Sequence, residues 1–362
     1  MQDTTCCHCG CVLNEEEQFC FDDEIYCEDC LEEVTVICDH CGRRILRDAD
    51  VGNENITLCA ACYHRYYLTC DRCGRILLED DAYYESDDDD RPYCYHCHAQ
   101  NNVIRNYYYK PEPIFYGSGL RYFGVELEVD CAGEDHVNAQ KVLNIANSID
   151  EFAYCKHDGS LSDGFELVTH PMTLAFHQAH MPWGRILDCL KHMGYRSHQT
   201  STCGLHCHIN RSSLGKTPEE QEEVIARILY FVEKHWEELV KFSRITQQQL
   251  DQWASRYGYH DSPKAILKRA KGGMGRYCCV NLTNEDTIEF RLFRGTLKYN
   301  TIIAALQLVD QICQAAISLC DDEIQNLSWT SFAAHCSQPE LIQYLKERRL
   351  YVNEPIESEV EV

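Results

Sequence analysis

The chain has 362 residues, of which 44% are hydrophobic, so it is long enough for two or three domains and is not a single small module. Its formal net charge of -25 disfavours nucleic-acid binding, which relies on cationic side chains. The first residues, MQDTTCCHCG, lack the basic and apolar regions of a signal peptide, and no run of about eighteen apolar residues occurs. We therefore expect a cytoplasmic protein that does not bind a membrane.

Cysteines dominate the first hundred residues, which contain 15 of the 25 in the chain. In a chain without an export signal, CxxC pairs indicate thiolate metal sites in a reducing compartment rather than disulfides. A repeat of 32 residues starts at Cys6, Cys38 and Cys70. Each repeat opens with CxxCG and closes with a second CxxC pair, which gives three sets: Cys6, Cys9, Cys27 and Cys30; Cys38, Cys41, Cys59 and Cys62; and Cys70, Cys73, Cys94 and Cys97.

Four thiolates from two such pairs can surround one zinc ion, and a closed shell of this kind leaves no position for substrate. We therefore predict three structural zinc ions in three modules, over residues 1–36, 37–68 and 69–100. The modules look like treble-clef zinc modules and are loosely similar to LIM domains, although seven residues rather than two separate successive repeats. Cys7, Cys11 and Cys20 fall outside the pattern.

Acidic residues are concentrated around these modules, since residues 1–113 carry a net charge of -16. An acidic zinc array is a poor candidate for nucleic-acid binding. We expect it to recruit a protein partner or a protein substrate instead.

The residues after the modules, NNVIRNYYYKPEPIFYGSGL, show no clear period and contain two prolines and two glycines, which predicts a linker over residues 101–119. We expect its three consecutive tyrosines to pack against a neighbouring domain, and a binding role for them stays open. A larger domain is predicted over residues 120–350, with an acidic tail over residues 351–362.

Helix-like and strand-like segments alternate in this larger domain. Thr217, Pro218 and Glu220 form the start signal of a helix, and apolar residues follow at helical spacing. Further helices are expected over residues 137–149, 174–193, 301–319 and 340–348. The strand-like segments between them are GVELEVD (124–130), GFELVTHP (164–171), GLHCHIN (204–210) and TIEFRLFRGT (287–296).

Positions two apart in a strand share a face. The strand-like segments therefore place polar residues on one face of a sheet and apolar residues, such as Leu127 and Phe290, on the other. A solvent-facing sheet would give a similar alternation, but it would mix Lys, Thr and Ser among the polar positions. The polar positions are instead ones that suit divalent cations and phosphate, namely Glu126, Glu128, Glu166, His206, His208, Glu289 and Arg291.

The segments GVELEV, DGS with FELVTHP, CGLHCHIN and IEFRLFRGT resemble the motifs of the amidoligase family, in the carboxylate-amine ligase superfamily of glutamine synthetase and glutamate-cysteine ligase. The resemblance covers about residues 120–320 and implies an α+β fold with a curved antiparallel sheet and helices on one face. It implies Mg²⁺ or Mn²⁺ ligation by Glu126, Glu128, Glu166, His206 and Glu289. It also implies phosphate contact by Arg291, a place near the nucleotide or metal for His208, and catalytic roles for Arg291, Glu289 and Glu128.

The function that this resemblance implies is ATP-dependent formation of an amide or isopeptide bond through an acyl phosphate. The segment KRAKGGMGRY is the main basic cluster, and its Lys271 and Arg276 are candidates for nucleotide binding, although a flexible basic loop explains the segment equally well. Asp158, in HDGSL, either supports the substrate side or is a turn residue.

Two other functions stay open. A metallohydrolase would use the same histidines and carboxylates without ATP, and an interaction protein would keep the fold without catalysis. Ten cysteines after residue 130 lack CxxC spacing, and most are expected to be buried apolar side chains. Cys203 and Cys207 are close enough in sequence to the two histidines to keep a zinc or thiol site open, although Cys207 should face away from them.

Overall fold

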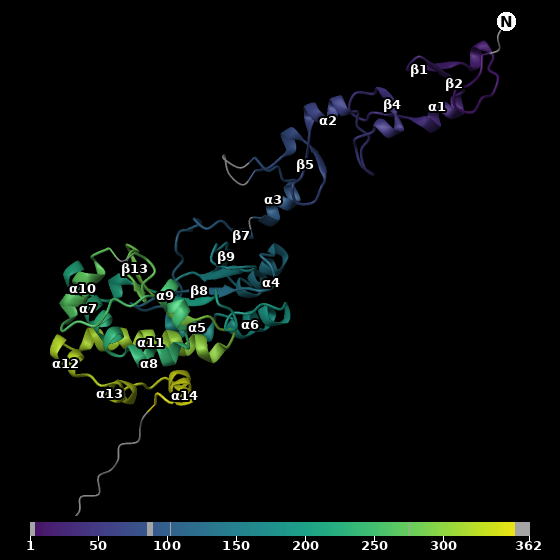
Figure 1. The fold of residues 1–362 in the computed structure, drawn as a ribbon. Coiled ribbons are helices and arrows are strands. Elements are labelled where there is room, and N and C mark those ends of the chain that lie inside the picture. Colours follow the sequence, from purple (N-terminus) through teal and green to yellow (C-terminus); the bar gives the residue numbers. More distant parts are fainter. Residues whose placement is uncertain (1–3, 85–89, 102, 274, 352–362) are drawn as a thin grey trace, which may run out of the picture. The chain divides into compact units, whose positions relative to one another are not determined.

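The computed structural model describes residues 4–84, 90–101, 103–273 and 275–351, so the predicted acidic tail lies outside the described residues from position 352 onward. The chain divides into two compact units, Met1–Asn102 and Val103–Val362 (Figure 1). Residues 103–119, for which the sequence predicts a linker, belong to the second unit.

The first unit repeats one small motif three times, a cysteine-containing turn followed by a hairpin or loop and then a short helix. Its described helices and strands are β1 (Phe19–Phe21), β2 (Glu24–Tyr26), α1 (Glu28–Val34), β3 (Thr35–Ile37), β4 (Arg44–Leu46), α2 (Ala60–Tyr66), β5 (Tyr67–Thr69), β6 (Ile76–Leu78) and α3 (Tyr95–Asn101), with 3-10 turns at Glu15–Glu17, Arg47–Ala49 and Glu79–Asp81. The strands form three two-stranded antiparallel sheets, β1–β2, β3–β4 and β5–β6.

The glycine of each CxxCG sequence closes the turn that brings the first two cysteines together. Gly10, Gly42 and Gly74 have φ of +77°, +70° and +70°, a backbone region that other residues rarely adopt. Each glycine N–H donates to the carbonyl of the first cysteine in its repeat, at 2.9 Å in all three modules. The backbone requirement explains why glycine recurs at this position.

The second unit is built on a seven-stranded sheet in the order β12-β13-β11-β8-β10-β9-β7. These strands are β7 (Ile104–Arg105), β8 (Phe123–Val129), β9 (Ala153–Lys156), β10 (Phe165–Thr169), β11 (Gly204–Asn210), β12 (Val280–Asn281) and β13 (Thr287–Arg294). Six strands pair in antiparallel fashion, as the family resemblance implies, but β7 pairs with β9 in parallel. The sheet is therefore mixed, and the expectation of an antiparallel sheet fails at this edge.

Helices of the second unit include the predicted ones and four more that lie outside the predicted ranges, at Gln247–Trp253, Pro263–Ala270, Asp321–Asn326 and Trp329–Ala334. In chain order, the described helices of this unit are α4 (His136–Ala146), α5 (Leu174–Ala179), α6 (Trp183–His192), α7 (Pro218–Lys234), α8 (Trp236–Ser243), α9 (Gln247–Trp253), α10 (Pro263–Ala270), α11 (Tyr299–Ser318), α12 (Asp321–Asn326), α13 (Trp329–Ala334) and α14 (Pro339–Glu347), with a 3-10 turn at Arg211–Ser213. The helix expected over residues 174–193 is divided at Pro182, which precedes α6. Helix α7 begins with the predicted capping box of Thr217 and Glu220.

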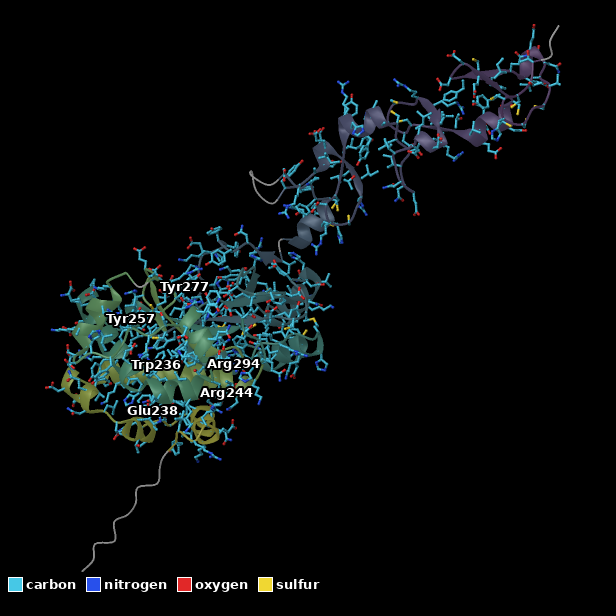
Figure 2. All side chains as sticks on the ribbon, in the orientation of Figure 1. Trp236, Glu238, Arg244, Tyr257, Tyr277 and Arg294 are labelled. Atoms are coloured by element: carbon cyan, nitrogen blue, oxygen red, sulfur yellow. The ribbon has the colours of Figure 1, made fainter. Side chains whose placement is uncertain are left out.

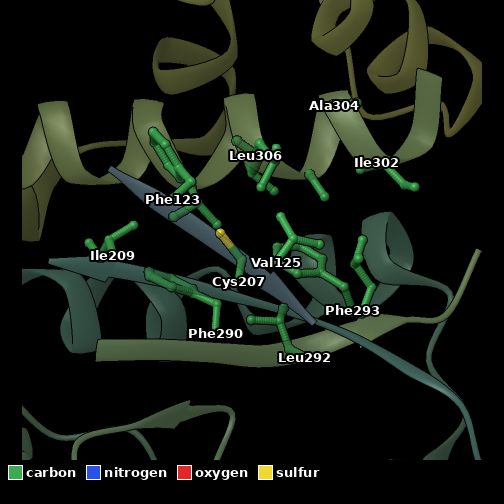
Figure 3. Close-up of a cluster of buried hydrophobic side chains, with 14 of the residues drawn as sticks. Phe123, Val125, Cys207, Ile209, Phe290, Leu292, Phe293, Ile302, Ala304 and Leu306 are labelled. Carbon is green, nitrogen blue, oxygen red and sulfur yellow. The ribbon is translucent and has the colours of Figure 1, made fainter. Parts of the chain in front are cut away.

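One face of the sheet is apolar and packs against helices. Side chains of β8, β11 and β13, including Val125, Cys207 and Phe290, are completely buried. Ile302 and Leu306 of α11 lie over these strands (Figure 3). The alternation along the strands thus leaves the opposite face to the polar side chains.

Helix α11 is the core helix of this layer. Its length and a mean hydropathy of 1.3 are also those of a membrane-spanning helix, but 61% of the same window is buried inside the fold. Packing against the sheet therefore accounts for its apolar composition.

Truncation of the apolar side chains tests this layer. Leu127→Ala and Phe290→Ala should each lower the free energy of unfolding by about 2–5 kcal/mol, because both side chains are fully buried and their loss leaves a cavity. The measurement is urea denaturation. Ile149, which is 81% exposed, provides a control, and its alanine variant should change stability by less than about 0.5 kcal/mol. Equal losses in all three variants would contradict the layer assignment.

Candidate functional site

The second and third modules bring their four predicted cysteines together. The sulfur atoms of Cys38, Cys41, Cys59 and Cys62 all lie within 4.8 Å of one another, and so do those of Cys70, Cys73, Cys94 and Cys97. Cys59 and Cys94 are the residues just before α2 and α3, so the helix start fixes one sulfur in each cluster. Both clusters fit a four-thiolate zinc site.

In the first module, a cysteine outside the predicted set enters the cluster. Cys11 joins Cys6, Cys9 and Cys27 in the cluster, and its sulfur lies 3.3 Å from that of Cys9. Cys30, the fourth cysteine of the predicted set, contacts the thiols of the other three and also forms a second group with His8 and Glu33. The CxxC spacing alone could not show this, because Cys11 follows the turn at Gly10 and returns toward Cys9.

Local backbone groups favour the thiolate form of one cysteine in each cluster. Burial opposes ionisation of Cys38, but the N–H groups of Cys59 and Cys41 lower the pKa of its thiol to about 6. The pKa values of the corresponding thiols, Cys6 and Cys70, are also lowered to about 6. Since the thiolate is the form that binds metal, the lowered pKa of these three cysteines favours zinc binding.

The polar face of the large sheet brings together the predicted residues of four different strands. Strand pairing places His206 opposite Glu126. It also places His208 opposite Glu289 and Glu166 opposite Glu128. Directly opposed residues in a sheet have neighbouring side chains, so the register itself assembles a cluster of carboxylates and imidazoles.

The side-chain distances in this cluster are short. His206 Nδ1 lies 3.1 Å from Glu126 Oε2 and 3.6 Å from Glu289 Oε1. The carboxylate of Glu128 lies 3.8 Å from His206 Nε2, and that of Glu126 lies 3.0 Å from His208 Nε2. Among the described residues, Glu126, His206 and Glu289 could contact one ion together, since their ligand atoms lie within 4.8 Å of one another.

Further groups hold the carboxylates in place. Arg291 Nη1 donates to Glu289 Oε1 at 2.5 Å, and Asn281 Nδ2 donates to Glu289 Oε2 at 2.8 Å. The backbone N–H of Gly204 donates to Glu128. Lys156 Nζ lies 3.9 Å from Glu166 Oε2, from the opposed position on β9.

The electrostatics of the face fit a divalent cation. Burial, together with repulsion from Glu126 and Glu128, raises the pKa of Glu166 well above its usual range. Burial and the charge of Asp158 also raise the pKa of Glu128. Burial and repulsion disfavour the charged form of these carboxylates, so a nearby cation would stabilise that form strongly. Oxygen ligands are those that Mg²⁺ prefers.

His208 is the cationic counterpart of these carboxylates. Its burial disfavours the charged form, but Glu126 and Glu289 raise its pKa to about 9. The same contacts lower the pKa of Glu126 well below its usual range despite burial. In the absence of metal, His208 is therefore protonated at neutral pH.

A cavity of about 720 Å³ lies over the polar face and is lined by all seven predicted residues of that face. The basic segment contributes Arg276 to its lining, but Lys271 pairs with Glu222 of α7 instead. Asp158 lines the cavity and accepts a hydrogen bond from the N–H of Ser160 at 2.7 Å, as expected of a turn residue.

Several residues that line the cavity were not predicted from the sequence. Lys156 follows the period-two pattern of AYCK in β9, and this alternation is the signal that could have found it. Asn281, Tyr277 (labelled in Figure 2) and Tyr107 come from a two-residue strand or from turns, where no periodic pattern exists.

Burial raises the pKa values of the two cysteines near the histidines. Cys207 lies on the apolar face, as expected, and burial raises the pKa of its thiol well above the usual range. Cys203 lines the cavity, but burial raises its pKa to about 12, so its thiol stays neutral.

Zinc content tests the cysteine clusters. The purified chain should contain three zinc ions, and Cys59→Ser with Cys62→Ser should lower the count to two by removing half of one shell. Inductively coupled plasma mass spectrometry gives the count. Cys320, which is exposed and outside the clusters, provides the control, and its serine variant should keep three. A wild-type count of one or none would contradict the assignment.

The raised pKa of His208 predicts a pH-dependent metal affinity. Because an ion held by Glu126 and Glu289 repels the proton on His208, Mn²⁺ should bind up to about tenfold more tightly for each pH unit between 7 and 9, and the gain should level off above pH 9. Electron paramagnetic resonance of free Mn²⁺ measures binding to the zinc-loaded chain. His208→Gln should flatten the profile, and an unchanged slope in this variant would exclude His208 as its origin.

Comparisons with known proteins identify a family for the second unit. The family described as "Putative amidoligase enzyme" matches residues 121–313, which include all seven residues of the polar face. No curated protein gives a significant match to the sequence. A crystal structure of a bifunctional glutathione synthetase from Pasteurella multocida is similar at 13% identity with a TM-score of 0.36, over 63% of this chain and 46% of that protein. The chain thus spans less than half the length of that enzyme. By the match over residues 121–313, the chain belongs to the amidoligase family.

Proposed function

We propose that the protein is an ATP-dependent carboxylate-amine ligase that forms an amide or isopeptide bond. The observation that carries the proposal is the polar sheet face, where strand pairing gathers four carboxylates, two imidazoles and a guanidinium in one cavity. The family match supports a ligase in general. A glutamine synthetase-like arrangement of the sheet and a cytoplasmic location are parts of the same proposal.

Each group of residues has a proposed task. The residues that hold Mg²⁺ or Mn²⁺ are Glu126, Glu128, Glu166, His206 and Glu289. A cation is needed there because it offsets the repulsion between the neighbouring carboxylates. Arg291 is positioned by Glu289 and faces the transferred phosphate, with His208 and Arg276 as further contacts to the nucleotide. Lys271 has no part in this scheme because it pairs with Glu222.

The reaction needs an activated acid, because a carboxylate is a poor electrophile. An oxygen of the substrate carboxylate bonds to the γ-phosphorus of ATP, the bond from that phosphorus to the bridging oxygen breaks, and ADP leaves, which gives an acyl phosphate. The substrate amine then attacks the carbonyl carbon, the C–O bond to phosphate breaks, and the amine loses a proton as the amide forms. Arg291 is placed to stabilise negative charge on phosphate oxygens during both steps.

The zinc modules have a separate proposed role. Closed four-cysteine shells do no chemistry on a substrate, so we assign the modules to recruiting a protein partner or a protein substrate. Their surroundings are strongly acidic, with a net charge of -16 over residues 1–113, which favours a basic protein surface over nucleic acid.

Removal of metal-type carboxylates tests the proposal. Glu128→Gln and Glu289→Gln keep the side-chain shape but remove charge from the proposed metal site, so turnover should fall about a hundredfold or more while the protein stays folded. Turnover is measured as ADP and phosphate release that depends on Mg²⁺ and on an amine and an acid. Suitable substrates are found by mass spectrometry of lysates incubated with the enzyme and ATP, as products that have lost water.

The control is Glu237→Gln on the exposed side of α8, which should leave turnover unchanged. Wild-type turnover in Glu128→Gln and Glu289→Gln would refute the site assignment. Turnover of a substrate by the wild type without ATP would replace the ligase with a metallohydrolase.

A further inference from the structure

A turn of tyrosines lies between the two-residue strand β7 and the rest of the second unit. We call residues 106–109 the tyrosine turn. The N–H of Tyr109 in this turn donates to the carbonyl of Asn106 at 3.1 Å. The turn is held at both ends. On one side, β7 pairs with β9, and the carbonyl of Arg105 accepts from the N–H of His157 at 2.8 Å. On the other side, the ring of Tyr109 packs edge-on against Tyr154, with centroids 5.4 Å apart.

Tyr107 points from this turn into the lining of the cavity. Its hydroxyl accepts a hydrogen bond from the guanidinium of Arg276. Its ring lies 5.5 Å from the Arg276 guanidinium and 5.6 Å from Lys156 Nζ, within the range of cation–π contacts. Tyr107 therefore connects the loop that carries Arg276 to the β9 edge of the sheet.

Arg276 differs from Arg291 in its partners. Arg291 is neutralised by Glu289 at 2.5 Å. Arg276 donates to the phenols of Tyr107 and Tyr277, the latter at 2.7 Å, and among the residues that the structure describes it has no carboxylate within ion-pair distance. The rings of both tyrosines also contact the guanidinium, but a neutral tyrosine does not cancel its positive charge. The charge of Arg276 is therefore not neutralised, although the chain has a formal charge of -25. A cation held by neutral groups beside a cavity is suited to an anionic ligand.

We propose that Tyr107 is a positioning residue that aims Arg276 at the phosphate groups of the ligand, so that the segment leaving the zinc modules completes the wall of the cavity. The inference rests on the proposed function for the identity of the ligand, a polyphosphate with its magnesium ion. Loss of the phenol hydroxyl frees Arg276 to turn toward solvent, and the anion then loses a fixed, charged donor.

A double-mutant cycle on the full, zinc-loaded chain tests this role. The probes are the magnesium complexes of a non-hydrolysable ATP analogue and of inorganic tripolyphosphate, with binding measured by isothermal titration calorimetry. Tyr107→Phe should weaken binding about three- to tenfold, since one hydrogen bond to a charged group is lost. Arg276→Gln should weaken binding at least as much. The double variant should bind no more weakly than Arg276→Gln alone, because Tyr107 acts through Arg276.

Tyr299→Phe is the matched control, because Tyr299 lies at the start of α11 outside the cavity lining. This variant should bind both probes as the wild type does. Wild-type affinity in Tyr107→Phe, or independent and additive effects in the double variant, would overturn the proposal. If the wild type binds tripolyphosphate but not the nucleotide analogue, and the cycle holds, the nucleotide assignment fails while Tyr107 keeps its role. If it binds neither probe, both proposals fail.

Discussion

Burial of like charges on one sheet face is the constraint on which the second unit depends. Glu128, Glu166 and Glu289 are nearly inaccessible to solvent, and an unpaired buried carboxylate is costly. The fold surrounds them with His208, Arg291 and Lys156, each placed by strand pairing or by a position two residues along a strand. The apolar face under α11 provides the burial that offsets this cost.

The charges on the polar face are only partly balanced, so the site is incomplete without a ligand. The carboxylates of Glu166 and Glu128 still have raised pKa values, which means that the surrounding cations do not fully compensate them. Natural proteins keep such unfavourable electrostatics where function requires it. A bound divalent ion would remove the penalty and would couple metal binding to the stability of the sheet.

The sequence predicts which side chains share a face better than it predicts which strands meet. Alternation in GVELEVD and GLHCHIN follows from the geometry of a single strand, so the polar and apolar faces could be derived locally. The pairing of His206 with Glu126 and of His208 with Glu289 depends on contacts far apart in the chain, so the alternation places these residues on one face without showing which of them are opposed.

The features that the sequence did not reveal are short or irregular. Strand β7 has two residues and therefore no period, so its sequence is that of a linker, and its parallel pairing with β9 could not be foreseen. Cys11 lies outside the CxxC spacing and enters its cluster only through the turn at Gly10. In both cases a turn or a single pair of contacts, rather than a repeating pattern, determines the position.

The pairing of β7 has a practical consequence for dividing the chain. A fragment that begins at residue 120, where the sequence suggests a boundary, would lose Ile104 and its pairing with Cys155. The backbone of β9 would then become an open sheet edge, which is a template for self-association. Cutting just before Val103 keeps the edge covered, so the same sheet would behave as a soluble fragment or as an aggregating one according to a difference of 17 residues at its N-terminus.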